Sequence, residues 1–121
     1  MLHKFKETYL IWFHYYTELP KPHRYTLGLR LDNLFVEVIE NIAIAKFSVS
    51  TAKLPFIITA ISKLDLVNLL LTILWETKSL QPERYLELSK KLDEIGKMMT
   101  SWKNSLATPK TNSPGTKPEE S

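Results

Sequence analysis

The sequence contains no cysteine, only three glycines and no long uninterrupted apolar run. The absence of cysteine excludes disulfides, thiolate metal sites and cysteine nucleophiles, and it is compatible with a reducing cytoplasm. The two longest apolar stretches, residues 54–61 and 64–75, are interrupted by polar side chains, so neither reaches the roughly 20 apolar residues of a membrane span. Residues 1–6 lack the features of a signal peptide. We therefore expect a cytoplasmic protein without a membrane segment.

The 121 residues, of which 44% are hydrophobic and 24% charged, suffice for one globular domain with a buried core. In four segments the apolar residues recur every three or four positions, which places them on one face of a helix. The stripes are Leu2, Phe5, Tyr9, Trp12, Tyr16 and Leu19; Leu27, Leu31, Leu34, Val38, Ile42 and Ala45; Ile57, Ala60, Leu64, Val67, Leu71 and Leu74; and Tyr85, Leu88, Leu92, Ile95, Met99, Trp102 and Leu106. The pattern predicts four helices and no strands.

Prolines mark the boundaries of the predicted helices. Pro20 and Pro22 separate the first two helices, Pro55 suits the first turn of the third, and Pro82 begins the fourth. The short connections predict an all-α fold, an antiparallel up-down-up-down four-helix bundle over residues 1–106. Residues 107–121 have almost nothing that a core could bury, and we expect them to form a disordered tail.

The third predicted helix carries a second apolar face. Apolar side chains outside its main stripe leave it hydrophobic nearly all round, and such a helix must be buried nearly all round. They are Ile58, Ile61, Leu66, Leu69 and Ile73. This excess predicts a homo-oligomer, because large exposed apolar patches are rare in monomers. The alternative is a deep helix that its neighbours cover with long side chains.

Two of the glycines, Gly28 and Gly96, lie inside predicted helices, where each costs about 1 kcal/mol relative to alanine. A close approach between helices is the simpler explanation, and contact of the backbone with a ligand is the alternative.

No arrangement of residues indicates catalysis, a metal or a cofactor. The histidines are His3, His14 and His23, and none follows a glutamate by three positions, as the metal motif of four-helix bundles requires. His14 and Glu18 are spaced as a surface pair on one helix. Asp65 is an acid within the most apolar helix; we expect a paired or hydrogen-bonded structural carboxylate rather than a catalytic one.

The formal net charge is +3, and the predicted topology concentrates it. An up-down bundle places residues 1–6, 41–64 and 97–106 at one end, and these stretches contain lysines but neither Asp nor Glu. The lysines are Lys4, Lys6, Lys46, Lys53, Lys63, Lys97 and Lys103. This end is either a binding surface for the phosphate backbone of RNA or DNA or a solvated, solubilising end. Binding of this kind is driven by charge rather than by base recognition.

Three motifs resemble one family. They are Pro20-Lys21-x-x-Arg24-Tyr25-x-Leu27-Gly28-x-x-Leu31, then Lys63-Leu64-Asp65-Leu66, then Arg84-Tyr85-x-x-Leu88-x-x-x-Leu92-x-x-Ile95-Gly96-x-x-x-x-x-Trp102. In this order and spacing the chain resembles the four-helix-bundle family of the accessory variability determinant (Avd) of diversity-generating retroelements. The same family contains the proteins encoded in bacterial 23S rRNA intervening sequences.

The resemblance implies a barrel-like homopentamer with a basic surface. Retroelement members associate with the reverse transcriptase and with nucleic acid, and they support mutagenic copying of a template RNA into DNA. In the intervening-sequence branch, the alternative is a structural or protein-interaction oligomer without nucleic-acid binding. This chain departs from the family at Asn68 and Thr72, where arginines are frequent.

The motif residues Arg24, Tyr25 and Gly28 are interpreted as structural. Arg24 is expected to bind Glu18 or a carbonyl of the turn, Tyr25 to pack over residues 20–22, and Gly28 to admit the first helix.

Overall fold

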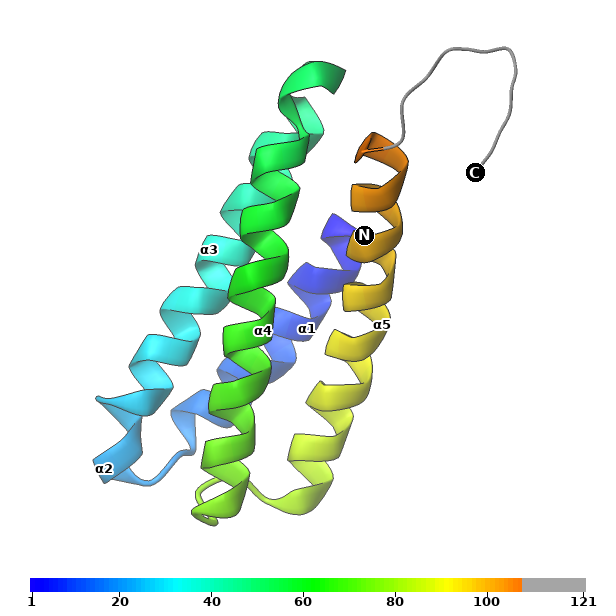
Figure 1. The fold of residues 1–121 in the computed structure, drawn as a ribbon. Coiled ribbons are helices and arrows are strands. Elements are labelled where there is room, and N and C mark those ends of the chain that lie inside the picture. Colours follow the sequence, from blue (N-terminus) through cyan, green and yellow to red (C-terminus); the bar gives the residue numbers. More distant parts are fainter. Residues whose placement is uncertain (108–121) are drawn as a thin grey trace.

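The computed structural model describes residues 1–107, and within them every regular element is helical (Figure 1). The elements are α1 (Leu2–Thr17), α2 (Lys21–Arg24), α3 (Leu27–Phe47), the 3-10 turn η1 (Ser50–Ala52), α4 (Leu54–Glu76) and α5 (Pro82–Ala107). The predicted all-α fold of four long helices is confirmed. The final helix includes Ala107, one residue beyond its predicted end, and the rest of the predicted tail lies outside the described residues.

Consecutive long helices run in opposite directions, as the short connections predicted (Figure 1). Helix α3 packs against α1 and α4, and α5 packs against α4 and α1. Helices α1 and α4 therefore lie at diagonally opposite corners of the bundle. This arrangement gives α4 two close neighbours and leaves its outer side uncovered.

The core is built from the predicted stripes. All six stripe residues of α4 are buried, as are Leu88, Leu92, Ile95 and Met99 of α5. Trp12 of α1 stacks on Phe35 of α3 with 5.4 Å between ring centres, and both side chains are fully buried. Burying a large apolar side chain contributes about 1.5–3 kcal/mol, so these shared stripes hold the helices together.

The second predicted helix is divided in the structure. Lys21–Arg24 forms the single turn α2, and α3 begins at Leu27. Thr26 lies between them in a non-helical conformation and donates a hydrogen bond from its hydroxyl to the Pro22 carbonyl. Pro55 lies in the first turn of α4 and Pro82 is the first residue of α5, as predicted.

The helical glycines differ in the space around them. A Cβ atom on Gly28 would lie 2.8 Å from Leu19 Cδ1 and 2.9 Å from the His23 carbonyl oxygen. The predicted close approach is therefore confirmed at Gly28. At Gly96 the nearest atom, Leu64 Cδ2, would be 3.5 Å away, which is ordinary van der Waals contact. No steric constraint of the single chain requires glycine there.

Helix α4 is long and apolar enough to cross a membrane by length and composition alone, with a mean hydropathy of 1.9 over its most apolar window. One third of that window is buried inside the bundle. The helix also carries Lys63 and Asp65 within its span. Its packing between α3 and α5 is compatible with a soluble protein.

We expect opposite effects from alanine at the two glycines. Gly28→Ala should lower the free energy of unfolding by about 1–3 kcal/mol, because the new methyl group overlaps backbone and side-chain atoms. Gly96→Ala should raise it by about 0.5–1 kcal/mol, because alanine favours the helix and fits the space. Urea unfolding followed by circular dichroism measures both. Equal stability of wild type and the Gly28 variant would contradict the close approach.

Candidate nucleic-acid interface

Within residues 1–107, one end of the bundle is formed by segments that contain no Asp or Glu. The last turns of α3, the connection over residues 48–53, the first turns of α4 and the last turns of α5 lie together there, whereas α1 begins further down (Figure 1). We call this end the tip and define it as residues 41–62 and 98–107, which contain no Asp or Glu. Of the predicted lysines, Lys46, Lys53 and Lys103 belong to the tip.

Three other predicted lysines lie in ion pairs. The pairs are Lys4 with Glu94 (3.2 Å), Lys63 with Glu37 (2.9 Å) and Lys97 with Asp93 (3.4 Å). The stretches that carry the seven lysines contain no acid, but the fold nevertheless pairs three of these lysines with carboxylates outside the stretches. Glu94 and Glu37 lie on helices that pack beside those of their lysines, and Asp93 lies one helical turn before Lys97 on α5. The two exposed pairs, at Lys4 and Lys97, contribute little to stability, and the Lys63 pair is half-buried. All three cancel local positive charge.

Lys53 supports the end of α3. Its Nζ donates hydrogen bonds to the carbonyl oxygens of Ala45 (2.7 Å) and Lys46 (3.1 Å). The last carbonyls of a helix have no partner within the helix, and a cation suits the negative end of the helix dipole. The ammonium also lies 6.0 Å from the centre of the Trp102 ring on α5. Lys53 therefore joins α3, α4 and α5 at the tip.

The remaining lysines have no carboxylate partner among the described residues. Lys46 is exposed, and its ammonium lies 5.9 Å from the centre of the Phe47 ring. Lys6 is exposed on α1, and Lys103 is half-buried near the end of α5. Lys46 and Lys103 therefore carry the positive charge of the tip that is engaged neither by an acid nor, as at Lys53, by backbone carbonyls.

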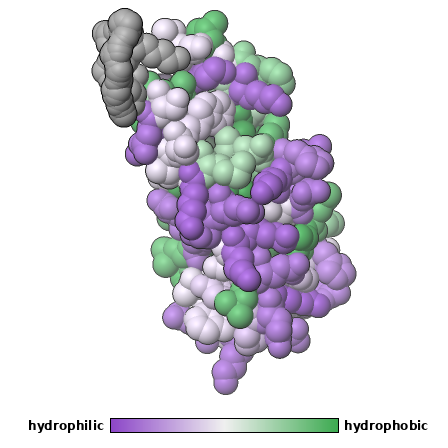
Figure 2. All heavy atoms as spheres, turned by 90° about the vertical axis from the view of Figure 1, so that its right-hand side faces the viewer, coloured by the Kyte–Doolittle hydropathy of each residue, from purple (hydrophilic) through white to green (hydrophobic). Residues whose placement is uncertain are grey.

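The α5 side of the bundle is mostly hydrophilic along its middle (Figure 2). A shallow hollow on this side is lined by Lys90, Lys91, Asp93, Glu94 and Lys97. Three cations and two carboxylates share this surface, so its charge is largely balanced. The tip, rather than the side of α5, is the candidate surface for a polyanion.

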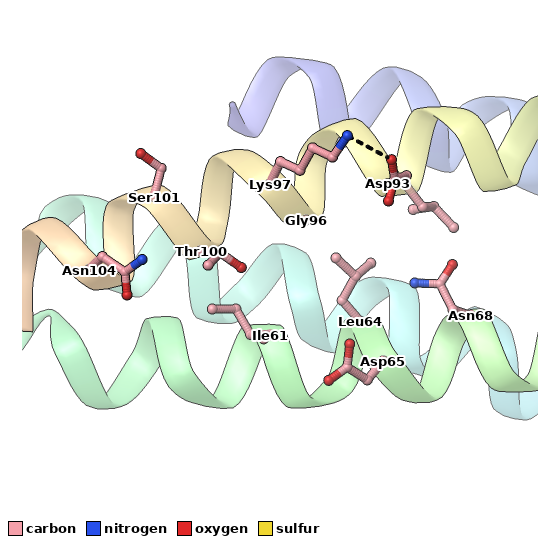
Figure 3. Close-up of a pocket in the computed structure, with 11 residues that line it drawn as sticks. Ile61, Leu64, Asp65, Asn68, Asp93, Gly96, Lys97, Thr100, Ser101 and Asn104 are labelled. Atoms are coloured by element: carbon pink, nitrogen blue, oxygen red, sulfur yellow. Dashed lines mark ion pairs between the residues drawn. The ribbon is translucent and has the colours of Figure 1, made fainter.

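An open groove of about 510 Å³ runs between α4 and α5. Ile61 and Leu64 form its apolar floor and point toward α5, while Lys97 is turned toward Asp93 (Figure 3). Asp65 lines this groove, is exposed, and makes no hydrogen bond or ion pair with residues 1–107. The expectation of a paired structural carboxylate at Asp65 is therefore wrong. The residue lies at the open groove between α4 and α5, where its side chain is exposed to solvent.

The first family motif lies at the opposite end of the bundle. Arg24 donates from Nε and Nη2 to the Leu19 carbonyl at 3.3 and 3.0 Å, which confirms the expected bond to a carbonyl of the turn. Tyr25 is 62% exposed, so packing over residues 20–22 accounts for a minor part of its surface at most. The missing Cβ of Gly28 leaves room for the side chains of Leu19 and Tyr16. Arg24 and Gly28 therefore serve the fold.

Glu18 pairs with Arg84 rather than with Arg24. Arg84 Nη1 lies 2.7 Å from Glu18 Oε1, and the guanidinium lies 4.5 Å from the centre of the Tyr15 ring. The hydrogen bond and the charge of Arg84 lower the pKa of Glu18. His14 lies 3.6 Å from Glu18, and both side chains are exposed, as expected of a surface pair. This network joins α1 to α5 at the end remote from the tip.

A polar pair lies within the aromatic cluster of α1 and α3. The Trp12 indole N–H donates to Asp32 Oδ1 at 3.2 Å. Burial and the hydrogen bond to Asp32 raise the pKa of Tyr9 to about 12. The Trp12 N–H and the Tyr9 hydroxyl thus both donate to the Asp32 carboxylate at the edge of the core, and these bonds orient the two aromatic rings. Its role is structural.

The two most exposed apolar side chains at the tip were not predicted as site residues. Phe47 is 81% exposed and Val49 is 70% exposed. By its sequence this stretch is a connection between helices, outside every apolar stripe. The signal available in the sequence was an aromatic residue beside a lysine within a stretch that lacks acids.

No group of three or more His, Asp or Glu side chains in residues 1–107 could hold a metal ion. The fold is a helical bundle whose described part has a tip without carboxylates and an uncovered apolar side on α4. The sequence matches the bAvd-like family over residues 1–106, and the chain belongs to this family. The family is of an accessory, non-catalytic type. None of the curated proteins matches the chain.

Lys53→Met should lower the free energy of unfolding by about 1–2 kcal/mol, because two helix-end carbonyls lose their donor. Lys46→Met is the matched control and should change it by about 0.5 kcal/mol or less, since its ammonium bonds no protein oxygen. Chemical unfolding of both variants tests the assignment. Equal effects of the two substitutions would show that Lys53 is not a cap.

Proposed function

We propose that the protein is a non-enzymatic accessory protein of a diversity-generating retroelement. In this role it binds the reverse transcriptase and the template RNA or its cDNA, and it supports mutagenic reverse transcription. Membership of the bAvd-like family supports the retroelement setting and the polymerase partner. The carboxylate-free tip supports the nucleic-acid part and is the observation that carries it.

The tip suits a phosphate backbone by its charge. Lys46 and Lys103 have no carboxylate partner among residues 1–107, and no acid occurs in the segments that form the tip. Lysines act as point charges for phosphates, so such binding would be strong at low salt and insensitive to sequence. Two lysines per chain are few, and the proposal therefore includes an assembly that multiplies them.

The outer side of α4 supports self-association. Ile58, Leu66 and Leu69 are 49%, 41% and 55% exposed, so the neighbouring helices do not cover them. With Pro55, Ser62 and Ile73 they recur every three or four residues, as in the seam of a helix that packs on another helix. The alternative of a fully covered helix does not fit this exposure.

A ring also requires a second apolar surface. In a cyclic assembly beyond a dimer, each subunit uses two different patches, one for each neighbour. Exposed apolar side chains on α1 and α3 provide a candidate for the second patch. They are Leu10, Phe13, Leu29 and Val36. A homopentamer is therefore part of the proposal, with the outer stripe of α4 as one interface.

The intervening-sequence alternative is an oligomer that binds proteins but not nucleic acid. The observation that favours it is the pairing of Lys4, Lys63 and Lys97 with acids, which removes three of the seven predicted lysines from the binding surface. The two candidates differ in their response to salt. Nucleic-acid binding weakens steeply as salt rises, whereas association through apolar surfaces does not.

Reversing the charge of the tip should weaken binding to nucleic acid. We expect the double variant Lys46→Glu and Lys103→Glu to bind a structured RNA at low salt roughly tenfold more weakly or worse. The slope of log affinity against log salt should become shallower by about one unit or less for each phosphate that the variant no longer neutralises. Fluorescence anisotropy over a salt series measures both quantities.

Lys21→Glu, at the opposite end of the bundle, is the matched control and should retain most of the affinity. Lys53 is left unchanged, because its loss would disturb α3. If the wild-type protein binds neither RNA nor DNA at low salt, the nucleic-acid part of the proposal is wrong and the interaction oligomer is the better account.

Charges on the outer side of α4 should prevent assembly. We expect the wild-type protein to sediment as an oligomer of the 14.1 kDa chain, and the double variant Leu66→Glu and Leu69→Glu to sediment as a monomer. Leu86→Glu, at a leucine of α5 that is 56% exposed, should leave the assembly intact. A wild-type mass of one chain at every concentration would refute self-association.

A further inference from the structure

Phe47 is the most exposed large apolar side chain in residues 1–107, with 81% of its surface accessible. It is the last residue of α3, and the core of the bundle makes no use of it. Leaving a phenylalanine in water forgoes the roughly 1.5–3 kcal/mol that burial would contribute. A side chain so placed is available to a ligand.

The backbone that carries this ring is well anchored. Lys53 donates to the carbonyls of Ala45 and Lys46, and Ser48 donates from its hydroxyl to the Ile44 carbonyl at 2.6 Å. The Ser48 N–H also bonds the Ala45 carbonyl at 3.2 Å. Ser48 and Lys53, which both follow Phe47, therefore bond the carbonyls of the three residues before it, and the ring projects from an ordered helix end.

The surroundings of the ring are cationic. The Lys46 ammonium lies 5.9 Å from its centre, and no Asp or Glu occurs within residues 41–62 or 98–107. An exposed aromatic face beside a lysine, among described segments that contain no carboxylates, matches the two needs of a single-stranded nucleic acid. A base stacks on the ring, and the adjacent phosphate meets the cation.

We infer that Phe47 stacks on an unpaired base of single-stranded RNA or DNA, and that Lys46 contacts the neighbouring phosphate. This inference rests on the proposed nucleic-acid function and adds to it the strand type and the residue that recognises it. A protein partner is less well matched. Ile44 and Ile58 of the tip are only 46% and 49% exposed, whereas the far more exposed Phe47 ring has the Lys46 ammonium 5.9 Å from its centre, which suits a charged ligand better than a wide apolar surface.

The test compares Phe47 variants on single and double strands. The probes are a fluorescent oligo(dA) of about 12 nucleotides, within the usual length of one binding site, and the duplex that it forms with oligo(dT). Stacking of one base is worth about 1–3 kcal/mol, so Phe47→Ala should bind the single strand roughly 5- to 150-fold more weakly. Its salt dependence and its affinity for the duplex should not change.

Conservative variants separate stacking from apolar contact. Phe47→Trp should retain the affinity for the single strand, and Phe47→Leu should lose it as Phe47→Ala does, because leucine fills space but has no aromatic face. Lys46→Ala should lower the salt slope by about 0.7, the value for one phosphate of a single strand. Val49→Ala is the control at a neighbouring exposed apolar side chain and should bind as wild type.

The failures are distinguishable. If wild type binds neither probe, the nucleic-acid function and this inference fall together. If wild type binds and Phe47→Ala binds the single strand equally well, the inference is overturned while the proposed function stands. If Phe47→Leu binds like wild type, or if Phe47→Ala lowers the sedimenting mass, Phe47 is an apolar protein contact and the inference is again overturned.

Discussion

The bundle depends on the burial of one apolar stripe from each of four helices, and α4 has more apolar surface than this arrangement can use. Its inner stripe is buried between α3 and α5, while Ile58, Leu66 and Leu69 stay in water. These side chains stay uncovered because α4 lies at a corner of the bundle, where only α3 and α5 pack closely against it. A surface of this kind favours a further copy of the chain, which connects the fold to the proposed assembly.

The chemistry of the tip follows from the need to satisfy a helix end. The carbonyls at the end of α3 lack partners within the helix, and Lys53 reaches back from the start of α4 to bond two of them. Lys53, which the sequence predicts as a nucleic-acid-binding residue, thus stabilises the fold. The same bonds order the last turn of α3, from which Lys46 and Phe47 project. Lys53 is structural because its ammonium group bonds backbone carbonyls, whereas the ammonium group of Lys46 bonds no protein oxygen and is available to a ligand.

Helix packing also decides how much positive charge remains. Glu37 and Glu94 lie outside the stretches that the sequence assigns to the lysine-rich end, yet each meets a lysine of another helix, and Asp93 holds Lys97 from one turn away. The positively charged surface that remains is smaller than the seven predicted lysines suggest, and it lies at the tip. It contains Lys46 and Lys103 and is bordered by exposed apolar side chains. A reverse-transcriptase accessory role, as proposed from the family, would use this surface for the template strand.

The sequence by itself determined the helices, their order and the inner stripes, because local spacing of apolar residues and the positions of Pro55 and Pro82 set these features. It also indicated the family and the second apolar face of α4. Only the tertiary structure decided which lysines are free, that Asp65 has no partner in the described residues, that Gly28 is closely packed while Gly96 has space, and that Phe47 is exposed. These features depend on distances between helices. Spacing along one chain segment reports which residues share a face, but it does not report which residue of another helix lies opposite.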